Sequence, residues 1–223
     1  MRPQILLLTL AITVPAAGVA AQSATRSPTR WDLTAGSGEG VTSLSVGAMR
    51  SRDVLPGDRL RLGLGLRSTF VTGDQRLTPA GAKNVPVGVI DTLTVPTAAV
   101  MLNVSGHVSI VLSSRLEAGM NIDLAGFGFG PSRQASYRAS AGATPSAVEA
   151  SPSTTNVFLY GSKDRGSLNS EFFAAWKVND RVTLRGGLSH QLTEYRAERT
   201  LSSNTDRFRH YSDLLFLGAR LSR

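Results

Sequence analysis

The stretch Arg59-Leu60-Arg61-Leu62-Gly63-Leu64-Gly65-Leu66-Arg67 places leucine at every even position and arginine or glycine at every odd position. Successive side chains of a β-strand point to opposite faces, so one face of this segment is apolar and the other is polar or small. The period of two predicts a β-strand. An α-helix would repeat its apolar residues at intervals of three and four.

Two further segments alternate in the same way, one from Ile110 to Ile122 and one from Val182 to Ser189 that continues to Leu192. Strands of about 9 to 13 residues are longer than the 5 or 6 residues usual in soluble sheets, and they match a tilted strand that crosses a membrane. These patterns predict an all-β protein that spans a membrane with strands.

The connections between the predicted strands alternate between short and long, which is typical of outer-membrane barrels with short periplasmic turns and long extracellular loops. Short connections are expected at Ser51–Asp58, Asn103–His107 and Asn179–Asp180, and long ones at Gly73–Asp91, Leu124–Gly166 and Arg196–Arg209. Within the longest, Ala135–Ser153 is rich in Ala, Ser and Pro, so we expect it to be mobile or disordered.

Bacterial barrels of one chain have an even number of strands and keep both ends in the periplasm. From Val41 onward the pattern predicts seven strands: Val41–Arg50, Arg59–Thr72, Thr92–Asn103, Val108–Asp123, Leu168–Val178, Val182–Tyr195 and His210–Ser222. A separate strand over Thr29–Gly36 makes eight, and we predict an eight-stranded antiparallel up-and-down transmembrane β-barrel. The alternative is one long strand over Thr29–Arg50 with a glycine bend, which leaves an odd number.

The N-terminus has the features of a secretion signal: a positive start at Met1-Arg2, an apolar stretch over Ile5–Val14 and small residues up to Ala21. We therefore predict a cleaved signal peptide over 1–21, an N-terminal extension over 22–28 and a single barrel domain over 29–223. No later segment is long and apolar enough for a spanning helix. The chain has 0 Cys, which excludes a disulfide framework and a lipid anchored on cysteine.

The strand faces opposite the leucines carry both signs of charge, and in a barrel these faces line the lumen. The predicted lumen charge network consists of Arg61, Arg67, Arg115, Glu117, Asp123, Glu171, Arg185 and Arg220, with Arg59 and Asn121 nearby. Buried charges need partners of opposite sign, so we interpret this network as a polar plug. The alternative is an arginine-lined path for anions.

Composition and motifs point away from several other functions. The formal net charge is +8, but the arginines are scattered along strands, which does not favour nucleic-acid binding. The three histidines lack metal-ligand spacing, and no cofactor motif is present. Ser189, His190 and Glu194 are the best candidates for a lipid-modifying hydrolase. Neighbouring strand residues point to opposite faces, however, which argues against a Ser189–His190 pair, and we predict that the protein is not an enzyme.

Periodicity alone does not say which face of the sheet is inside. A soluble periplasmic barrel with an apolar lumen for a small apolar ligand therefore stays an alternative. The aromatic residues fall mostly near strand ends, as in the girdles of membrane barrels, although they make up only 6% of the chain. We expect outer-membrane lipid and lipopolysaccharide as contacts, the outer-membrane insertion machinery as a partner during biogenesis, and a monomer.

Two stretches carry a resemblance: Gly119-Met120-Asn121-Ile122-Asp123-Leu124-Ala125-Gly126-Phe127-Gly128-Phe129-Gly130, and Asp164-Arg165-Gly166-Ser167-Leu168-Asn169-Ser170-Glu171-Phe172-Phe173 with Leu192-Thr193-Glu194-Tyr195 beyond it. They resemble the uncharacterised small outer-membrane β-barrel proteins of Gram-negative bacteria. The resemblance implies an OmpA/OmpX-like barrel in the outer membrane and brings no activity or ligand with it.

The C-terminus departs from the usual pattern of such barrels. Barrel proteins commonly end on an aromatic residue that closes an alternating apolar pattern read by the insertion machinery. This chain ends Phe216-Leu217-Gly218-Ala219-Arg220-Leu221-Ser222-Arg223, in which Gly218 and Leu221 fit that pattern and Arg223 does not.

Overall fold

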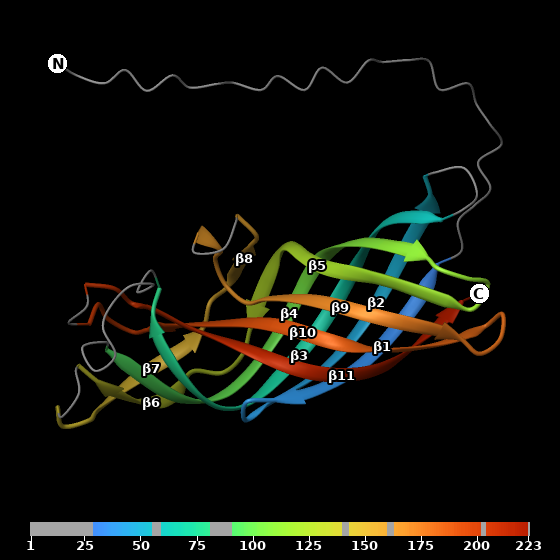
Figure 1. The fold of residues 1–223 in the computed structure, drawn as a ribbon. Helices are drawn as coiled ribbons and strands as arrows, with labels where there is room; N and C mark the ends of the chain where they lie inside the picture. Colours follow the sequence, from blue (N-terminus) through green and yellow to red (C-terminus); the bar gives the residue numbers. More distant parts are fainter. Residues whose placement is uncertain are drawn as a thin grey trace, which may run out of the picture.

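The computed structural model describes residues 29–54, 59–80, 91–139, 143–159, 163–201 and 204–222. The predicted signal peptide (1–21), the extension (22–28) and Arg223 lie outside these residues. The described residues form antiparallel strands that run along one common axis (Figure 1). No helix among them is long and apolar enough to cross a membrane.

The described residues contain eleven strands, three more than the predicted eight. Their bounds are β1 (Arg30–Gly38), β2 (Val41–Asp53), β3 (Leu60–Pro79), β4 (Thr92–Val111), β5 (Leu116–Phe129), β6 (Arg133–Arg138), β7 (Ser146–Pro152), β8 (Thr155–Val157), β9 (Leu168–Lys177), β10 (Val182–Ala197) and β11 (Arg207–Ser222). The three additional strands, β6 to β8, all come from the segment predicted to be one long loop.

The sheet closes on itself to form a β-barrel. In sequence order β1 pairs with β2, β2 with β3, β3 with β4 and β4 with β5. The circuit continues from β5 to β9, β10 and β11, and β11 pairs with β1 from Arg30↔Ser222 to Ser37↔Leu215. Closure satisfies the backbone N–H and C=O groups of every strand in the circuit, as a lipid environment requires.

The N-terminal segment forms two strands joined by a tight turn, as its split at the glycines predicts. Glu39 and Gly40 connect β1 to β2, and both have positive φ, at 49° and 75°. Two consecutive residues of positive φ are the requirement of a type I′ turn, whose twist matches that of the flanking strands. The hairpin is short because the turn needs only these two residues.

The short turn predicted at Asn103–His107 is wrong. β4 continues through these residues to Val111, and the chain turns at 112–115 instead. There the Ser113 hydroxyl accepts hydrogen bonds from the backbone N–H groups of Arg115 (3.3 Å) and Leu116 (3.1 Å), which stabilises the turn. The predicted strand over Val108–Asp123 therefore belongs to two strands, β4 and β5. These two strands pair with a register shift between Val104 and Ser105, opposite Leu124.

The segment Ala135–Ser153, expected to be mobile, forms the hairpin of β6 and β7. β6 pairs with β4, and β7 pairs with β10. At the same end β3 pairs with β11 through Phe208↔Pro79. Four barrel strands thus continue beyond the β1–β2 hairpin, and with β6 and β7 they form a second, narrower ring of six strands (Figure 1). We call this ring the β-extension; it consists of β6, β7 and the adjoining ends of β3, β4, β10 and β11.

The β-extension is ordered by an apolar core of its own. Every second residue of β6 and β7 is buried against the four longer strands, which a composition rich in Ala and Ser conceals. The core consists of Leu77, Leu93, Val95, Ala135, Tyr137, Val148, Ala150, Tyr195, Ala197, Leu201 and Phe208. Burying this much apolar surface offsets the entropy lost by ordering the hairpin.

A charge placed in this core should unfold the β-extension and leave the barrel intact. We expect Val148→Asp to open the β6–β7 hairpin, because an unpaired buried carboxylate costs several kcal/mol. Limited trypsin digestion at Arg133 and Arg138 measures the opening, and gel migration without boiling measures the barrel. The matched control is Ala147→Asp, whose side chain is exposed on the same strand. Equal cleavage of the two variants would contradict the assigned core.

Candidate functional site

The outer surface of the barrel is apolar. Leu62, Leu64 and Leu66 are 47%, 62% and 58% exposed, whereas Arg67 on the opposite face is 6% exposed. Along β3 the exposed apolar positions run from Leu62 to Phe70, a length of about 26 Å at roughly 3.3 Å per residue. Strands of outer-membrane barrels tilt by about 35–45°, so this length corresponds to a height of about 20 Å, close to the roughly 25 Å apolar band of such barrels. The protein is a membrane-spanning β-barrel of the outer-membrane type.

This arrangement decides which face of the sheet is inside. The soluble alternative requires apolar side chains in the lumen and the arginine face in solvent. The structure has the reverse arrangement over the barrel, so it does not support an apolar ligand site in this part of the lumen. Aromatic residues lie at the edges of the band: exposed Trp31 and Trp176 at the end that holds the chain termini, and exposed Phe127 and Phe129 at the other.

Buried charges of alternating sign line the lumen, beginning with Arg67 on β3. Its guanidinium lies 2.6 Å from Asp123 on β5 and 3.0 Å from Glu171 on β9. The second Asp123 oxygen accepts hydrogen bonds from the Asn103 amide (2.8 Å) and the Asn169 backbone N–H (3.0 Å). Both carboxylates are almost fully buried, so these partners replace the water that they lose.

The series continues through Arg185 and Arg220 toward the end with the chain termini. Arg185 joins Glu171 (3.3 Å) to Asp32 (3.0 Å), and Arg220 joins Asp32 (2.9 Å) to Glu117 (3.0 Å). Arg61 then lies 2.8 Å from Glu117 and 2.8 Å from Asp53. We call this series the charge ladder. Its members in order are Asp123, Arg67, Glu171, Arg185, Asp32, Arg220, Glu117, Arg61 and Asp53.

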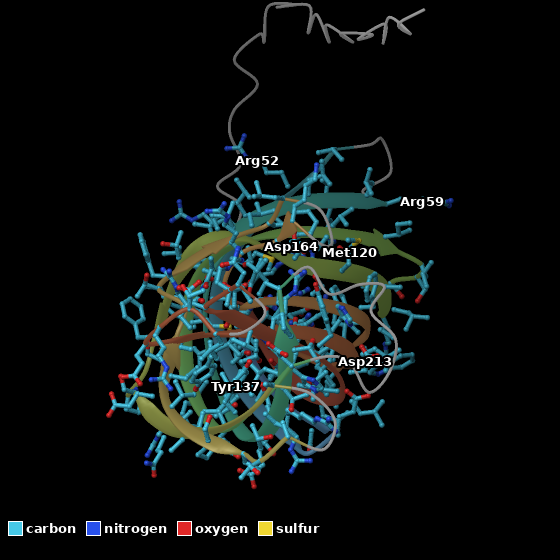
Figure 2. All side chains as sticks on the ribbon, turned by 90° about the vertical axis from the view of Figure 1, so that its left-hand side faces the viewer. Arg52, Arg59, Met120, Tyr137, Asp164 and Asp213 are labelled. Atoms are coloured by element: carbon cyan, nitrogen blue, oxygen red, sulfur yellow. The ribbon has the colours of Figure 1, made fainter. Side chains whose placement is uncertain are left out.

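The charge ladder contains seven of the eight residues predicted for the lumen network. The exception is Arg115, which is exposed in the 112–115 turn because β4 extends further than predicted. Arg59 is also exposed, ahead of β3, and its side chain projects away from the barrel (Figure 2). Sequence reasoning missed two members of the ladder, Asp32 and Asp53. For Asp32, the position between the apolar Trp31 and Leu33 is a signal for a lumen-facing charge.

Neutral side chains complete the lumen around the charge ladder. The Asn121 amide donates to Glu171 (2.9 Å), and its oxygen lies 2.7 Å from His107 Nδ1. His107 was expected in a turn, but it lies mid-strand on β4 and stacks on Phe173 at 5.8 Å. The guanidinium of Arg185 also lies over the Phe173 ring, 4.2 Å from its centroid.

Packed side chains fill the space that the strands enclose (Figure 2). The cavity beside Arg67 and Glu171 has a volume of only about 20 Å³, little more than one water molecule needs. Beyond the charge ladder, Val41, Val71, Met101 and Leu214 form a buried apolar layer. The core of the β-extension follows this layer. No open path through the described part of the barrel is visible in this packing.

A cavity of about 410 Å³ opens at the end with the chain termini. Its lining includes Arg30, Arg61, Arg115, Lys177 and Asp180. Asp180 lies in the β9–β10 turn, outside the membrane-spanning strands, and its carboxylate is 2.7 Å from Nζ of Lys177, the last residue of β9. The hydrogen bond and the charge of Lys177 lower the pKa of Asp180. The cavity ends at the charge ladder, at Glu117 and Arg220.

The structure does not bring the candidate hydrolase residues together. Ser189 faces the lumen, where its hydroxyl donates to Asn169 (2.6 Å). His190 points outward and pairs with Asp213 at 2.7 Å. Glu194 is buried against Arg207, 2.6 Å away, and Ser153. Among the described residues no group of His, Asp or Glu has the geometry to hold a metal ion.

No family model and no curated protein matches the chain. Among solved structures it is similar to a major outer membrane protein from Thermus thermophilus, with a TM-score of 0.41, 17% identity and coverage of 87% of this chain and 99% of that one. It is also similar to Neisserial surface protein A (TM-score 0.34, 12% identity, 87% and 94% coverage) and to the Yersinia pestis outer membrane protein Ail (0.34, 8%, 88% and 99%).

Removing one member of the charge ladder should destabilise the barrel strongly. We expect Arg67→Met to lower the free energy of unfolding by about 3–5 kcal/mol, because it leaves Asp123 and Glu171 buried without their shared partner. Urea unfolding of the reconstituted protein, followed by Trp fluorescence, measures the change. Arg115→Met is the control, with an expected change within about 0.5 kcal/mol because its side chain is exposed. Similar values for both variants would rule out a structural role for the ladder.

Proposed function

We propose that the protein is a non-enzymatic, monomeric, eight-stranded outer-membrane barrel that holds the β-extension at the cell surface for contact with other molecules. The eight strands are β1 to β5 and β9 to β11, whose pairings form one circuit. The observation that carries the proposal is the filled interior. A barrel closed by a charge ladder, an apolar layer and an apolar core serves as an anchor and not as a channel.

The connections support an orientation for this barrel. The first residue of β1 and the last of β11 are paired, so both chain ends lie at one end of the barrel. The β9–β10 turn and the β4–β5 turn, at 112–115, lie at the same end, and short turns are typical of the periplasmic side. The β-extension then faces outward. The 1–21 segment fits this topology, since a secretion signal delivers the chain from the periplasmic side.

The exposed charges of the outward end favour contact with anionic lipopolysaccharide. Basic side chains exposed there are Arg133, Arg138, Lys163, Arg165 and Arg199. Guanidinium groups bind phosphate by paired hydrogen bonds, which suits a surface rich in phosphorylated lipid. The outer-membrane insertion machinery is the partner that we propose for biogenesis, with β11 as the strand that presents the C-terminal pattern.

Conductance measurements test the plugged lumen. We expect the purified protein in a planar lipid bilayer to show no stepwise ion currents, because side chains of the described residues fill the lumen around the charge ladder. The measurement requires that the same preparation show heat-modifiable gel migration, which reports a folded barrel. Discrete current steps from such a preparation would refute the anchor and favour the arginine-lined anion path.

Cysteine labelling tests the orientation, since the chain has 0 Cys of its own. Ala147 on β7 and Ser114 in the β4–β5 turn are both exposed. We expect Ala147→Cys to react with a membrane-impermeant maleimide on intact cells, and Ser114→Cys to react only after the outer membrane is permeabilised. The reverse pattern would show that the β-extension lies in the periplasm.

A further inference from the structure

A pocket of about 430 Å³ lies on the outer face of the barrel wall over β9, β10 and β11. Its lining is Phe158, Asp164, Leu168, Ser170, His190, Leu192 and Tyr211. The volume is within the range of small-molecule sites, which are mostly apolar with a few polar groups. The pocket therefore differs from the lumen in both position and chemistry.

The strand registers place the floor of the pocket in two rows across the three strands. One row is Leu168, Leu192 and Tyr211, and the next is Ser170, His190 and Asp213. The row that follows, Phe172, Leu188 and Leu215, belongs to the apolar band and is 54–72% exposed. The pocket is thus continuous with the lipid-facing band and lies at its outward edge.

The segment around β8 forms the roof of the pocket. Leu168 and Leu192 are only 5% and 3% exposed although they point outward, because this segment lies over them. β8 pairs with β5, and the Phe158 N–H donates to the Leu124 carbonyl (2.8 Å). The Leu159 N–H donates to the Asp164 carboxylate (2.9 Å). The roof is therefore fixed by hydrogen bonds to the barrel wall and within itself.

The polar groups of the pocket are arranged around Tyr211. His190 pairs with Asp213 at 2.7 Å, and its ring stacks on Tyr211 at 5.3 Å. The Tyr211 hydroxyl is buried and has no hydrogen-bond partner in the described part of the chain. Tyr211 therefore contributes its ring, and not an accessible hydroxyl, to the lining of the pocket. Ser170 and His190 are opposite each other, but no hydrogen bond joins them, so the row lacks an assembled nucleophile and base.

We propose that this pocket binds one acyl chain of an outer-membrane lipid, with the acyl linkage beside the polar row of Ser170 and His190. Phe158, Leu168 and Leu192 supply the apolar walls for the chain. The position fits this ligand, because the carbonyl groups of a lipid lie at the boundary between the acyl chains and the headgroups. The inference rests on the outer-membrane placement of the proposed function.

Photo-crosslinking tests the site. The full chain is reconstituted in phosphatidylethanolamine vesicles that contain a phospholipid with a diazirine in its acyl chain, and adducts are mapped by mass spectrometry. We expect adducts to concentrate on the pocket residues. Leu192→Trp, which fills the pocket, should reduce them by about tenfold. The control is Leu188→Trp, which points outward on the same strand in the apolar band.

Three results separate the outcomes. Pocket labelling that Leu192→Trp leaves unchanged, in a protein with heat-modifiable migration, overturns the lipid site. Stronger pocket labelling by a free fatty acid that carries the same diazirine overturns the assignment to membrane lipid. Adducts along Leu62–Leu66 report the membrane placement separately, so their absence would contradict the proposed function and not the pocket alone.

Discussion

Neutralisation of buried charge is the constraint on which the barrel depends. A closed ring of alternating strands that presents leucine to lipid must turn its other face inward, where water is scarce. Each guanidinium of the ladder therefore lies between two carboxylates. Two of these carboxylates, Asp123 and Glu171, accept further hydrogen bonds from the Asn103 and Asn121 amides and from the Asn169 backbone N–H. The ladder joins β1, β2, β3, β5, β9, β10 and β11 through side chains, in addition to the backbone pairing.

The polarity of the inside and of the outside is exchanged where the β-extension begins. In the membrane the barrel is polar inside and apolar outside. In the β-extension the apolar residues lie inside, around Tyr195 and Phe208, and charged residues such as Arg133 and Arg138 lie outside. β3, β4, β10 and β11 run through both environments without interruption. The change in pattern along one strand marks the point where the surroundings change from lipid to water.

The sequence was most informative where one residue type repeats with period two. The Arg59–Arg67 stretch predicts the strand, its faces and the lumen positions of Arg61 and Arg67, because a strand between lipid and a polar lumen requires that alternation. It was least informative for β6 and β7, where Ala135 and Ala150 bury little surface each and resemble loop composition. β6 and β7 are ordered because they pack against Leu77, Leu93 and Phe208, which are distant in sequence.

The structure brings the predicted charged residues together where they lie on well-assigned strands, and it separates from them Arg115, which lies at a strand end. Arg115 was placed in the lumen because the turn was assigned to Asn103–His107, where Gly106 and polar residues mimic a connection. Asp32 was missed because its only signal is local, namely its position between the apolar Trp31 and Leu33 in a short strand. The position of the Ser113 turn, and so the face of each residue after it, follows from pairing with β3 and β9, which local sequence does not encode.

The continuity of β3, β4, β10 and β11 has a mechanical consequence. A force applied to the β-extension along the barrel axis passes directly into strands whose ladders with their neighbours are 12 to 18 residue pairs long on the β3–β4, β4–β5 and β10–β11 sides. Such a load shears the hydrogen bonds of a ladder together, so they resist in parallel. A loop attached at a strand end would instead peel bonds away one at a time. The β-extension is thus joined to the barrel by strands that resist a pull along the barrel axis together.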